Sequence, residues 1–366
     1  MRVSYDPQTF LRQRSGGISR LFTDLIKEFD TDPSLGVEVS LPFKASNNVY
    51  LANELSGRSI KSMPNWIPRG ALYAPWWVRG AKVHQGLEIV HRTYYSQRFL
   101  GAPKHVKQVV TIHDMIPELF ADSEYFTATH LAKRNYVKEC DLVICISEST
   151  RKDLKEIYGD LSNNTVVIHN SVDASFGQLS EPLDNLPVEY LLYVGARKGY
   201  KDFSLLPKAL ELLRDGERFE IPLVVVGPKF TAIEIEEIRN RGLLKSIINV
   251  QLSDEDLKRA YSHSALLVQT SRYEGFGLTP LEGMASGVPV IAANSSSMPE
   301  VGGDVVQYFN PGDHEDLARL LVSVLTNNSL RSDLGNRGRI RALEFTTHTM
   351  AMKTQQAYSH LLYGEL

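Results

Sequence analysis

Two glutamates that frame a glycine-containing loop are the residues most suited to chemistry. Glu274 and Glu282 are separated by seven residues, and Gly275 and Gly277 lie between them. Carboxylates accept charge-assisted hydrogen bonds from the paired hydroxyls of a ribose or a hexose. Glycines let a backbone approach a ligand closely, and the amides at a helix start favour phosphate. The combination indicates a sugar nucleotide as the ligand.

The elements around this loop must place both acids at the mouth of one helix. The apolar run 265–269 predicts a buried strand before the loop, and the run 288–293 predicts another strand after it. We expect Thr279 as the N-cap of the intervening helix, with Pro280 at its first position and Gly287 as its stop. The unit is therefore strand, loop, helix, strand.

Two alternatives to a ligand-binding role stay open for this segment. Thr279 and Glu282 also fit a capping box, in which Glu282 lies in the first helical turn and serves only its own helix. Phe276 could be an ordinary core residue.

A second loop carries positive charge. Residues 190–194 predict a strand, and Arg197, Lys198 and Lys201 follow it. A pyrophosphate that leaves a sugar gains negative charge in the transition state, so fixed cations stabilise it most at that moment. Arginine offers a planar fork to phosphate oxygens, and lysine offers a mobile point charge. The alternative is a solvated cationic loop, and the two lysines compete for the role.

The first half of the chain has two further candidate motifs. His113 follows the predicted strand 109–112, at the strand end where doubly wound sheets bind ligands. Gly16 and Gly17 precede a helix. His113 could instead be a structural hydrogen-bonding residue, and Asp114 could be a helix N-cap.

Apolar strands alternate with amphipathic helices, which is typical of open parallel sheets with helices on both faces. Further strands are expected at Val3, 142–146, 166–168 and 222–227, and helices at 18–29 and 346–363. The polar segment 175–187 predicts a linker. A chain of 366 residues exceeds what one core usually serves, and 43% apolar residues suffice for two domains.

These motifs occur in the order found in retaining glycosyltransferases of family 4, which the chain resembles over nearly its whole length. The resemblance rests on Gly16-Gly17, His113, the turn at Asn170, Arg197 and the block 274–290. It implies the α/β GT-B fold, in which two Rossmann-like doubly wound domains face each other across a cleft. The implied domains are an acceptor-binding domain at 1–178, a nucleotide-sugar-binding domain at 188–345, and a C-terminal helix at 346–366 that crosses back to the first domain.

The resemblance also implies a role for each candidate residue. Glu274 holds hydroxyls of the donor sugar, Glu282 holds the ribose, and His113 orients the transferred sugar. Arg197 and Lys201 bind the diphosphate, although the interval between them is shorter than in some members, which leaves the choice of lysine open. The catalytic set is His113, Arg197, Lys201 and Glu274, and the donor-binding set is Gly16, Gly17, Arg197, Lys201, Glu274, Gly275, Phe276, Gly277, Leu278 and Glu282.

The family transfers a sugar with retention of configuration and without a metal, so we expect no metal and no cofactor apart from the donor substrate. Asp30 and Asp32 look like a metal-binding pair, but they follow a helix and are interpreted as a solvated turn. No carboxylate of the first domain stands out as a covalent nucleophile. This favours front-face attack, in which the leaving phosphate helps to deprotonate the incoming hydroxyl.

The cationic loop 195–201 looks like that of mannosyltransferases of bacterial surface-polysaccharide assembly, such as lipopolysaccharide O-antigen. This favours GDP-mannose as the donor and a glycan or lipid-linked glycan as the acceptor, with a UDP-hexose as the alternative donor. Two other classes stay open: a sugar-nucleotide epimerase of the same fold and a hinged sugar-binding protein of the transport type.

Composition restricts the partners and the location. A net charge of −3 without a basic domain argues against nucleic acid. Only two cysteines and no long apolar run predict a cytoplasmic protein. Between Arg58 and Lys107 basic residues outnumber acids, and Trp66, Trp76 and Trp77 lie there. This combination suits a peripheral contact with the inner face of the membrane, and the alternative is packed tryptophans beside a solvated charged face.

Overall fold

The chain folds as two compact units. The computed structural model describes residues 1–42, 46–55, 86–96, 103–120, 124–159, 164–178, 180–216 and 221–364. Unit 1 comprises Met1–Ser171 together with Thr347–Leu366, and unit 2 comprises Val172–Thr346. The polar segment 175–187, expected as a linker, belongs to unit 2. The three tryptophans and their basic neighbours in 56–85 lie outside the described residues.

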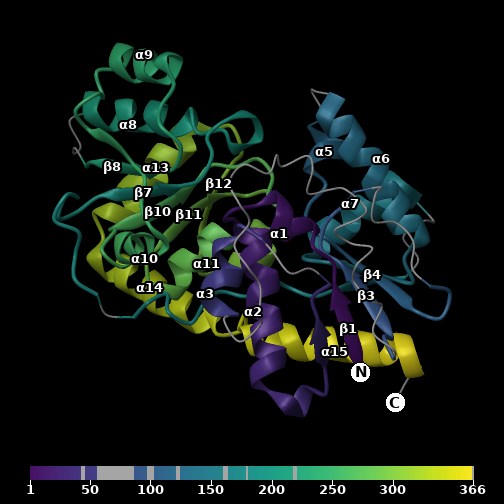
Figure 1. Cartoon of the computed structure of the whole chain (residues 1–366). Helices are drawn as coiled ribbons and strands as arrows, with labels where there is room; N and C mark the ends of the chain where they lie inside the picture. The colour runs from purple at the N-terminus through teal and green to yellow at the C-terminus, as the bar shows by residue number, and fades with distance from the viewer. Residues whose placement is uncertain are drawn as a thin grey trace. The chain divides into compact units, whose positions relative to one another are not determined.

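Unit 1 is built around a parallel six-stranded sheet in the order β2-β1-β3-β4-β5-β6 (Figure 1). The strands are β1 Arg2–Tyr5, β2 Glu38–Ser40, β3 Ile89–Arg92, β4 Lys107–Ile112, β5 Leu142–Cys145 and β6 Thr165–Val167. The helices are α1 Gln8–Arg12, α2 Gly17–Thr31, α3 Val49–Glu54, α5 Ile116–Leu119, α6 Glu124–Glu139, α7 Glu148–Tyr158 and α15 Thr347–Tyr363, with a 3-10 turn, η1, at Pro33–Leu35. Because all neighbours pair in parallel, the carboxyl ends of the strands share one edge of the sheet.

The core of unit 1 is completed by α15, from the other end of the chain. Helix α2 has one apolar face, which buries Leu21, Phe22, Leu25, Ile26 and Phe29. Helix α15 packs on α2 and adds Met350, Ala351 and Tyr358 to the same core (Figure 1). The hydroxyl of Tyr358 lies 2.9 Å from that of Tyr5 in β1, and it also hydrogen-bonds Nδ1 of His91 in β3. Polar groups therefore fix where α15 lies along the sheet.

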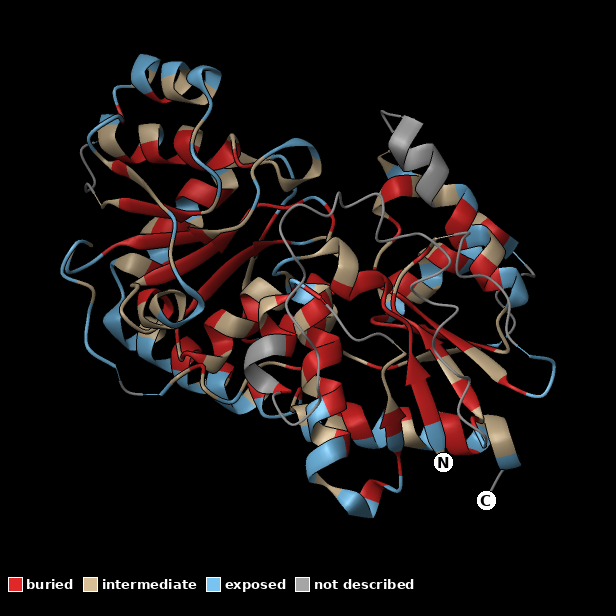
Figure 2. Cartoon of the chain, in the orientation of Figure 1, coloured by how far each residue is buried: buried red, intermediate tan, exposed pale blue. Residues whose placement is uncertain are grey.

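Unit 2 holds a second parallel sheet, in the order β12-β11-β10-β7-β8-β9. Its strands are β7 Leu191–Val194, β8 Leu223–Val226, β9 Ile247–Val250, β10 Leu266–Gln269, β11 Val290–Ala293 and β12 Gln307–Phe309. Its helices are α8 Leu205–Asp215, α9 Ala232–Asn240, α10 Asp254–Ser262, α11 Leu278–Ala285, α12 Met298–Gly302, α13 His314–Leu325 and α14 Asn328–Ala342, with a 3-10 turn, η5, at Gly199–Lys201. Central strands such as β10 and β11 are buried throughout (Figure 2).

The predicted pair of parallel α/β sheets is confirmed. Every strand expected from an apolar run is present, and the expected helices at 18–29 and 346–363 are α2 and α15. Strands β2, β3, β9 and β12 were not predicted. One local expectation is wrong: α11 begins at Leu278 with Gly277 as its N-cap, so Thr279 lies inside the helix. Gly277 can adopt the left-handed conformation at this position, which threonine cannot do easily.

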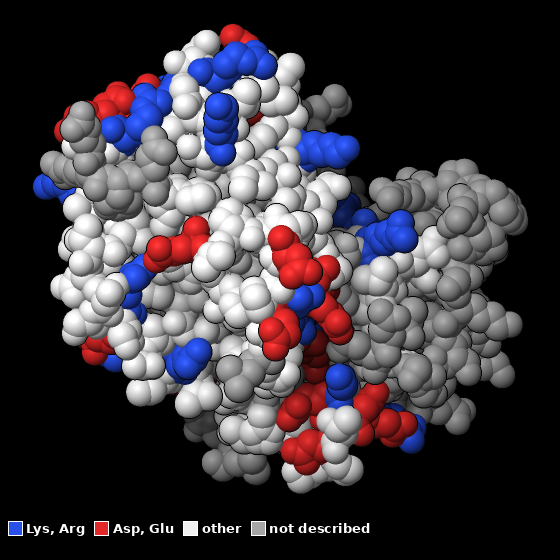
Figure 3. Space-filling view, turned by 90° about the vertical axis from the view of Figure 1, so that its left-hand side faces the viewer, with Lys and Arg blue, Asp and Glu red and all other residues white. Residues whose placement is uncertain are grey.

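Within the described part of the chain, no helix is long and apolar enough to span a lipid bilayer. On the face drawn in Figure 3, lysines and arginines lie interspersed with aspartates and glutamates. Neighbouring turns of the helices of unit 2 form ion pairs, such as Arg259 with Asp256 and Arg319 with Asp316. Exposed pairs of this kind contribute little to stability.

Candidate functional site

Lys201 and Glu274 form the centre of the candidate site. Nζ of Lys201, in η5 after β7, lies 2.6 Å from Oε1 of Glu274, in the loop after β10. Strands β7 and β10 are parallel neighbours, so the loops that follow them meet at one edge of the sheet. The structure thus brings together a cation and an acid that the sequence assigned to one ligand. Lys198, the competing lysine, is exposed.

Hydrogen bonds tie these two loops to each other. The amide of Arg272 donates to the carbonyl of Tyr200 at 2.7 Å, and Oγ1 of Thr270 donates to the carbonyl of Lys201 at 2.8 Å. Arg272 also lies 3.5 Å from the carboxylate of Asp202. The relative placement of Lys201 and Glu274 is therefore set by the backbone as well as by their own ion pair.

A third loop, after β11, holds the backbone of Glu274. The amide of Glu274 donates to Oγ of Ser296 at 2.8 Å, and Oγ of Ser297 donates to the carbonyl of Glu274 at 2.9 Å. Ser296 has a φ of 46°, in the left-handed region that non-glycine residues rarely adopt. Such strain persists where the surrounding structure requires it, often at functional sites. Three loops therefore converge on Glu274.

The start of α11 depends on a glycine. Gly277 has a φ of 101°, and a Cβ atom there would clash with Cε of Met298. The amides of Leu278 and Thr279 come before the first intrahelical hydrogen bond, so the helix start favours an anion. The ring of Phe276 is buried 5.7 Å from that of Phe345, as the core alternative expected. The backbone amide of Phe276 lies in the same loop as Gly275.

Glu282 does not cap its own helix, so the capping-box interpretation is wrong. Helix α11 has no side-chain hydrogen bond at its N-cap, and Glu282 lies four residues after Leu278, in the second turn. The hydroxyl of the buried Tyr261, in α10, instead donates to Oε2 of Glu282 at 2.8 Å. Glu282 therefore remains a candidate for the ribose.

Arg197 binds the carboxylate of Glu234 and does not contact Glu274. Its Nε and Nη2 atoms donate to the two carboxylate oxygens of Glu234 at 2.7 and 3.2 Å, and Nη1 donates to the carbonyl of Pro228 at 2.7 Å. The guanidinium lies 4.5 Å from the ring centre of Phe230, and the side chain is only 5% exposed. Burial raises the pKa of Glu234, but hydrogen bonds from Arg197 and Thr231 outweigh it and lower this pKa to about 2. The fork assigned to phosphate thus holds a carboxylate.

In unit 1, His113 is buried directly after β4. Its Nε2 is 3.2 Å from the carbonyl of Thr93, which can only accept, so the proton of the neutral ring is assigned to Nε2. Its amide donates to the hydroxyl of Tyr95 at 2.8 Å, and Phe22 meets the ring edge-on at 5.8 Å. Burial lowers the pKa of His113 to about 4. His113 is therefore neutral at physiological pH.

A buried ion pair supports the backbone next to His113. Nζ of Lys133, in α6, donates at 2.7 Å both to Oε2 of Glu118 and to the carbonyl of Asp114. The side chains of Lys133 and Glu118 are 0% and 1% exposed. The N-cap of α5 is Met115, so Asp114 is not that cap, although its carboxylate accepts from the amide of Ile116 at 3.0 Å.

Gly16 and Gly17 lie at the start of α2, as the sequence predicted for a loop that precedes a helix. Gly16 is the N-cap and has an extended backbone with φ 160°. Oγ of Ser19 donates to its carbonyl at 3.0 Å, and the amide of Ser19 donates to Oε1 of Gln13 at 3.0 Å. These contacts order the start of the helix.

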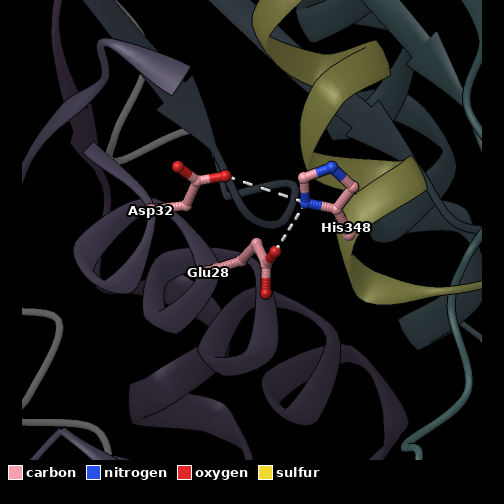
Figure 4. Close-up of side chains that lie close together, drawn as sticks. All are labelled: Glu28, Asp32 and His348. Carbon is pink, nitrogen blue, oxygen red and sulfur yellow. Dashed lines mark hydrogen bonds and ion pairs between the residues drawn. The ribbon is translucent and has the colours of Figure 1, made fainter. Parts of the chain in front are cut away.

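One group among the described residues has the donor atoms of a metal site: Glu28, Asp32 and His348 (Figure 4). Nδ1 of His348, in α15, faces the carboxylates of Glu28 at 2.9 Å and Asp32 at 3.8 Å, both at the end of α2. Hydrogen bonds from Ser34 are the main cause that lowers the pKa of Asp32. Because His348 is 52% exposed, we interpret the group as an ion-pair cluster that joins α15 to α2.

Sequence reasoning missed three residues whose side chains hydrogen-bond side chains of the candidate set: Gln269, Tyr261 and Glu234. Gln269 could have been noticed, because it is the polar end of an otherwise apolar strand. Tyr261 and Glu234 both lie on helices. Tyr261 is 21 residues from its partner Glu282 along the chain, and Glu234 is 37 residues from its partner Arg197. No local pattern connects residues at those separations.

Two buried histidines, His91 in β3 and His113 directly after β4, predict that unit 1 loses stability in acid. Burial lowers the pKa of His91 to about 3 and that of His113 to about 4, from an ordinary value of 6.5. Between about pH 6.5 and 4 the unfolded chain binds protons that the native unit does not, so the unfolding free energy falls as pH falls. The slope approaches about 1.4 kcal/mol per pH unit for each histidine.

Denaturant unfolding of unit 1 at several pH values between 7.5 and 4.5 measures this slope. His113→Asn is expected to remove about half of it, because one of two such groups contributing equally is lost. His360→Asn, at an exposed position of α15, is the matched control and should leave the slope unchanged. A stability that stays flat over this range contradicts the prediction.

The amino-acid sequence matches the models of two known enzyme families. Residues 15–176 match the family model described as Glycosyltransferase Family 4, and residues 180–341 match the model described as Glycosyl transferases group 1. The chain belongs to these glycosyltransferases and has their GT-B fold.

Among its relatives is the O-antigen chain mannosyltransferase B of Escherichia coli, 26% identical over 73% of this chain and 74% of the relative. Among solved structures, sucrose-phosphate synthase from Thermosynechococcus elongatus is similar with a TM-score of 0.75 at 19% identity, over 100% of both chains. Anabaena HepE, solved in complex with UDP-glucose, has a TM-score of 0.73 at 19% identity, over 98% of this chain and 99% of HepE. At 19% identity, these two structures show that the fold is shared.

Proposed function

We propose that this enzyme transfers mannose from GDP-mannose to a glycan or lipid-linked glycan, with retention of configuration and without a metal or other cofactor. The observation that carries the proposal is the contact of 2.6 Å between Lys201 and Glu274, beside the start of α11. A cation suits the phosphates and an acid suits the sugar hydroxyls, so their closeness supports a sugar diphosphate as the ligand. The first-turn amides of α11 add a partial positive charge at the same edge.

In the proposed reaction the bond between the anomeric carbon and the phosphate oxygen breaks, and its electron pair stays on the phosphate. The acceptor hydroxyl oxygen bonds to the anomeric carbon on the same face, and its proton passes to the leaving phosphate. Lys201 and the amides of α11 stabilise the charge that grows on the diphosphate. Arg197 joins them only by exchanging the carboxylate of Glu234 for phosphate oxygens. Glu274 and Glu282 bind the sugar and the ribose, and neutral His113 orients the transferred sugar.

The donor is inferred from the relatives. The Escherichia coli relative is a mannosyltransferase by name, which supports mannose and an O-antigen-type acceptor. A UDP-hexose is the second candidate, because the solved HepE complex contains UDP-glucose.

Calorimetry with GDP and UDP tests the donor. We expect GDP to bind at least about tenfold more tightly, a difference of about 1.4 kcal/mol. Tighter binding of UDP overturns GDP-mannose as the donor and leaves the transfer reaction standing.

A product-mass screen with GDP-mannose, UDP-glucose and crude lipid-linked acceptor tests the reaction. We expect a hexose added to the acceptor, with activity retained in EDTA and the anomeric configuration retained by NMR. An isomerised free sugar nucleotide would instead identify an epimerase, and binding without turnover would identify a sugar-binding protein. Loss of transfer in EDTA contradicts metal independence.

A further inference from the structure

Gln269, the last residue of β10, is buried in an apolar strand and is only 2% exposed. Its Oε1 has no hydrogen-bond partner among the described residues. A buried acceptor without a partner costs about 1–3 kcal/mol, so buried polar atoms are nearly always paired. Methionine has a similar length and no such group. The unpaired Oε1 of Gln269 is therefore a cost to stability that a methionine at this position would not carry.

The other end of the Gln269 amide does have a partner. Its Nε2 donates to Oε1 of Glu274 at 2.8 Å, the same oxygen that lies 2.6 Å from Nζ of Lys201. A reversed amide would set two acceptor oxygens against each other, so the contact itself assigns the nitrogen. Oε1 of Glu274 thus lies against two donors from two different elements, β10 and η5.

Two donors on one oxygen fix the rotation of the carboxylate. No hydrogen bond from the described residues falls on Oε2 of Glu274, and the side chain remains 14% exposed. Oε2 is therefore the oxygen that this arrangement leaves for a ligand. Because Gln269 is neutral, it orients the acid without adding a second cation that would compete with Lys201.

We propose that Gln269 is a positioning residue for the donor sugar: it holds Oε1 of Glu274 so that Oε2 accepts from the sugar hydroxyls. The proposal rests on the proposed function of Glu274. Ser271, two residues further on, has a fully buried Oγ that likewise lacks a partner among the described residues. Within five residues of Glu274 along the chain, Gln269 and Ser271 thus each carry a buried polar atom that lacks a partner in the described part of the chain.

The test is Gln269→Met, assayed with whichever of GDP-mannose and UDP-glucose the wild-type protein turns over. We expect a melting temperature equal to or above that of the wild type, because an unpaired buried acceptor is removed. We expect kcat/KM to fall about tenfold, mainly through a higher KM for the donor. The affinity for the nucleoside diphosphate alone should stay within about twofold, because that ligand has no sugar for Glu274 to hold.

Gln269→Glu gives a second readout that a structural role would not produce. It sets a carboxyl beside Oε1 of Glu274, and two such acids favour a shared proton. Activity should therefore fall further at neutral pH and recover partly as pH is lowered. Gln307→Met, on the edge strand β12 of the same sheet, is the matched control and should retain wild-type kinetics.

The outcomes separate this inference from the proposed function. Wild-type kcat/KM in Gln269→Met overturns the inference alone, as does a fall in activity that merely follows a lower melting temperature. Absence of sugar transfer in the wild-type protein overturns the proposed function and this inference together. Loss of affinity for the nucleoside diphosphate as well as the donor also contradicts a role limited to the sugar.

Discussion

Replacing Glu274 with glutamine is expected to lower kcat/KM for sugar transfer by about 100- to 1,000-fold, or about 2.7–4 kcal/mol of transition-state stabilisation. The change removes a charged acceptor for the sugar hydroxyls. It also leaves the ammonium of Lys201 without its carboxylate at 2.6 Å. Steady-state kinetics with the donor and acceptor identified in the product-mass screen measure the effect.

Binding of the nucleoside diphosphate should survive this substitution, because its phosphates contact Lys201 and the start of α11 in the proposed complex. Glu315→Gln, at an exposed position of α13, is the control and should behave like the wild type. A Glu274→Gln enzyme within about threefold of wild-type kcat/KM would remove Glu274 from the catalytic set, since a lost charge-assisted hydrogen bond alone exceeds that effect.

Lys133→Met is expected to destabilise unit 1 by about 3–5 kcal/mol, because it leaves the carboxylate of Glu118 buried without its cation. Glu118 is 1% exposed, and its remaining neighbours are the hydroxyl of Tyr158 at 2.8 Å and Nδ1 of His130 at 3.6 Å. Neither replaces a full positive charge at 2.7 Å. Hydrogen exchange of the β4 amides during denaturant unfolding reports the change in this unit.

The variant Lys138→Met, at an exposed position of α6, removes the same charge without the burial and should change stability by less than about 0.5 kcal/mol. Adding Glu118→Leu to Lys133→Met should restore part of the lost stability, since no charge then remains buried. A single variant within about 1 kcal/mol of the wild type, a change typical of point substitutions, would show that the pair is not stabilising.

The sequence predicted best what is local. The strand before the Glu274 loop, the glycines and the following helix occupy one contiguous stretch, and periodicity alone locates them. Strand β3 was missed because it ends in His91 and Arg92, which are polar although buried. The other three missed strands, β2, β9 and β12, lie at the edges of their sheets, and each includes a polar residue and is only partly buried. Without a continuous apolar run, the sequence pattern does not separate them from loops.

The chemistry of the site was predicted less completely, because partners are set by tertiary packing. Nothing near Arg197 in the sequence points to Glu234, and the helix start moved because Gly277 adopts a conformation that composition does not reveal. The contact between Lys201 and Glu274 could not be predicted from the sequence either, because it depends on hydrogen bonds between the two loops. These bonds depend on β7 and β10 being neighbours in the sheet.

The placement of Tyr358 also has a consequence for biosynthesis. Unit 2 is one uninterrupted segment, Val172–Thr346, so it can fold on the ribosome as soon as it emerges. Unit 1 emerges earlier, yet Tyr5 and His91 must wait for the hydroxyl supplied by α15. The part of this enzyme that is made first is therefore the last to complete its core, and until α15 has emerged the apolar surface that α15 covers is open to chaperones.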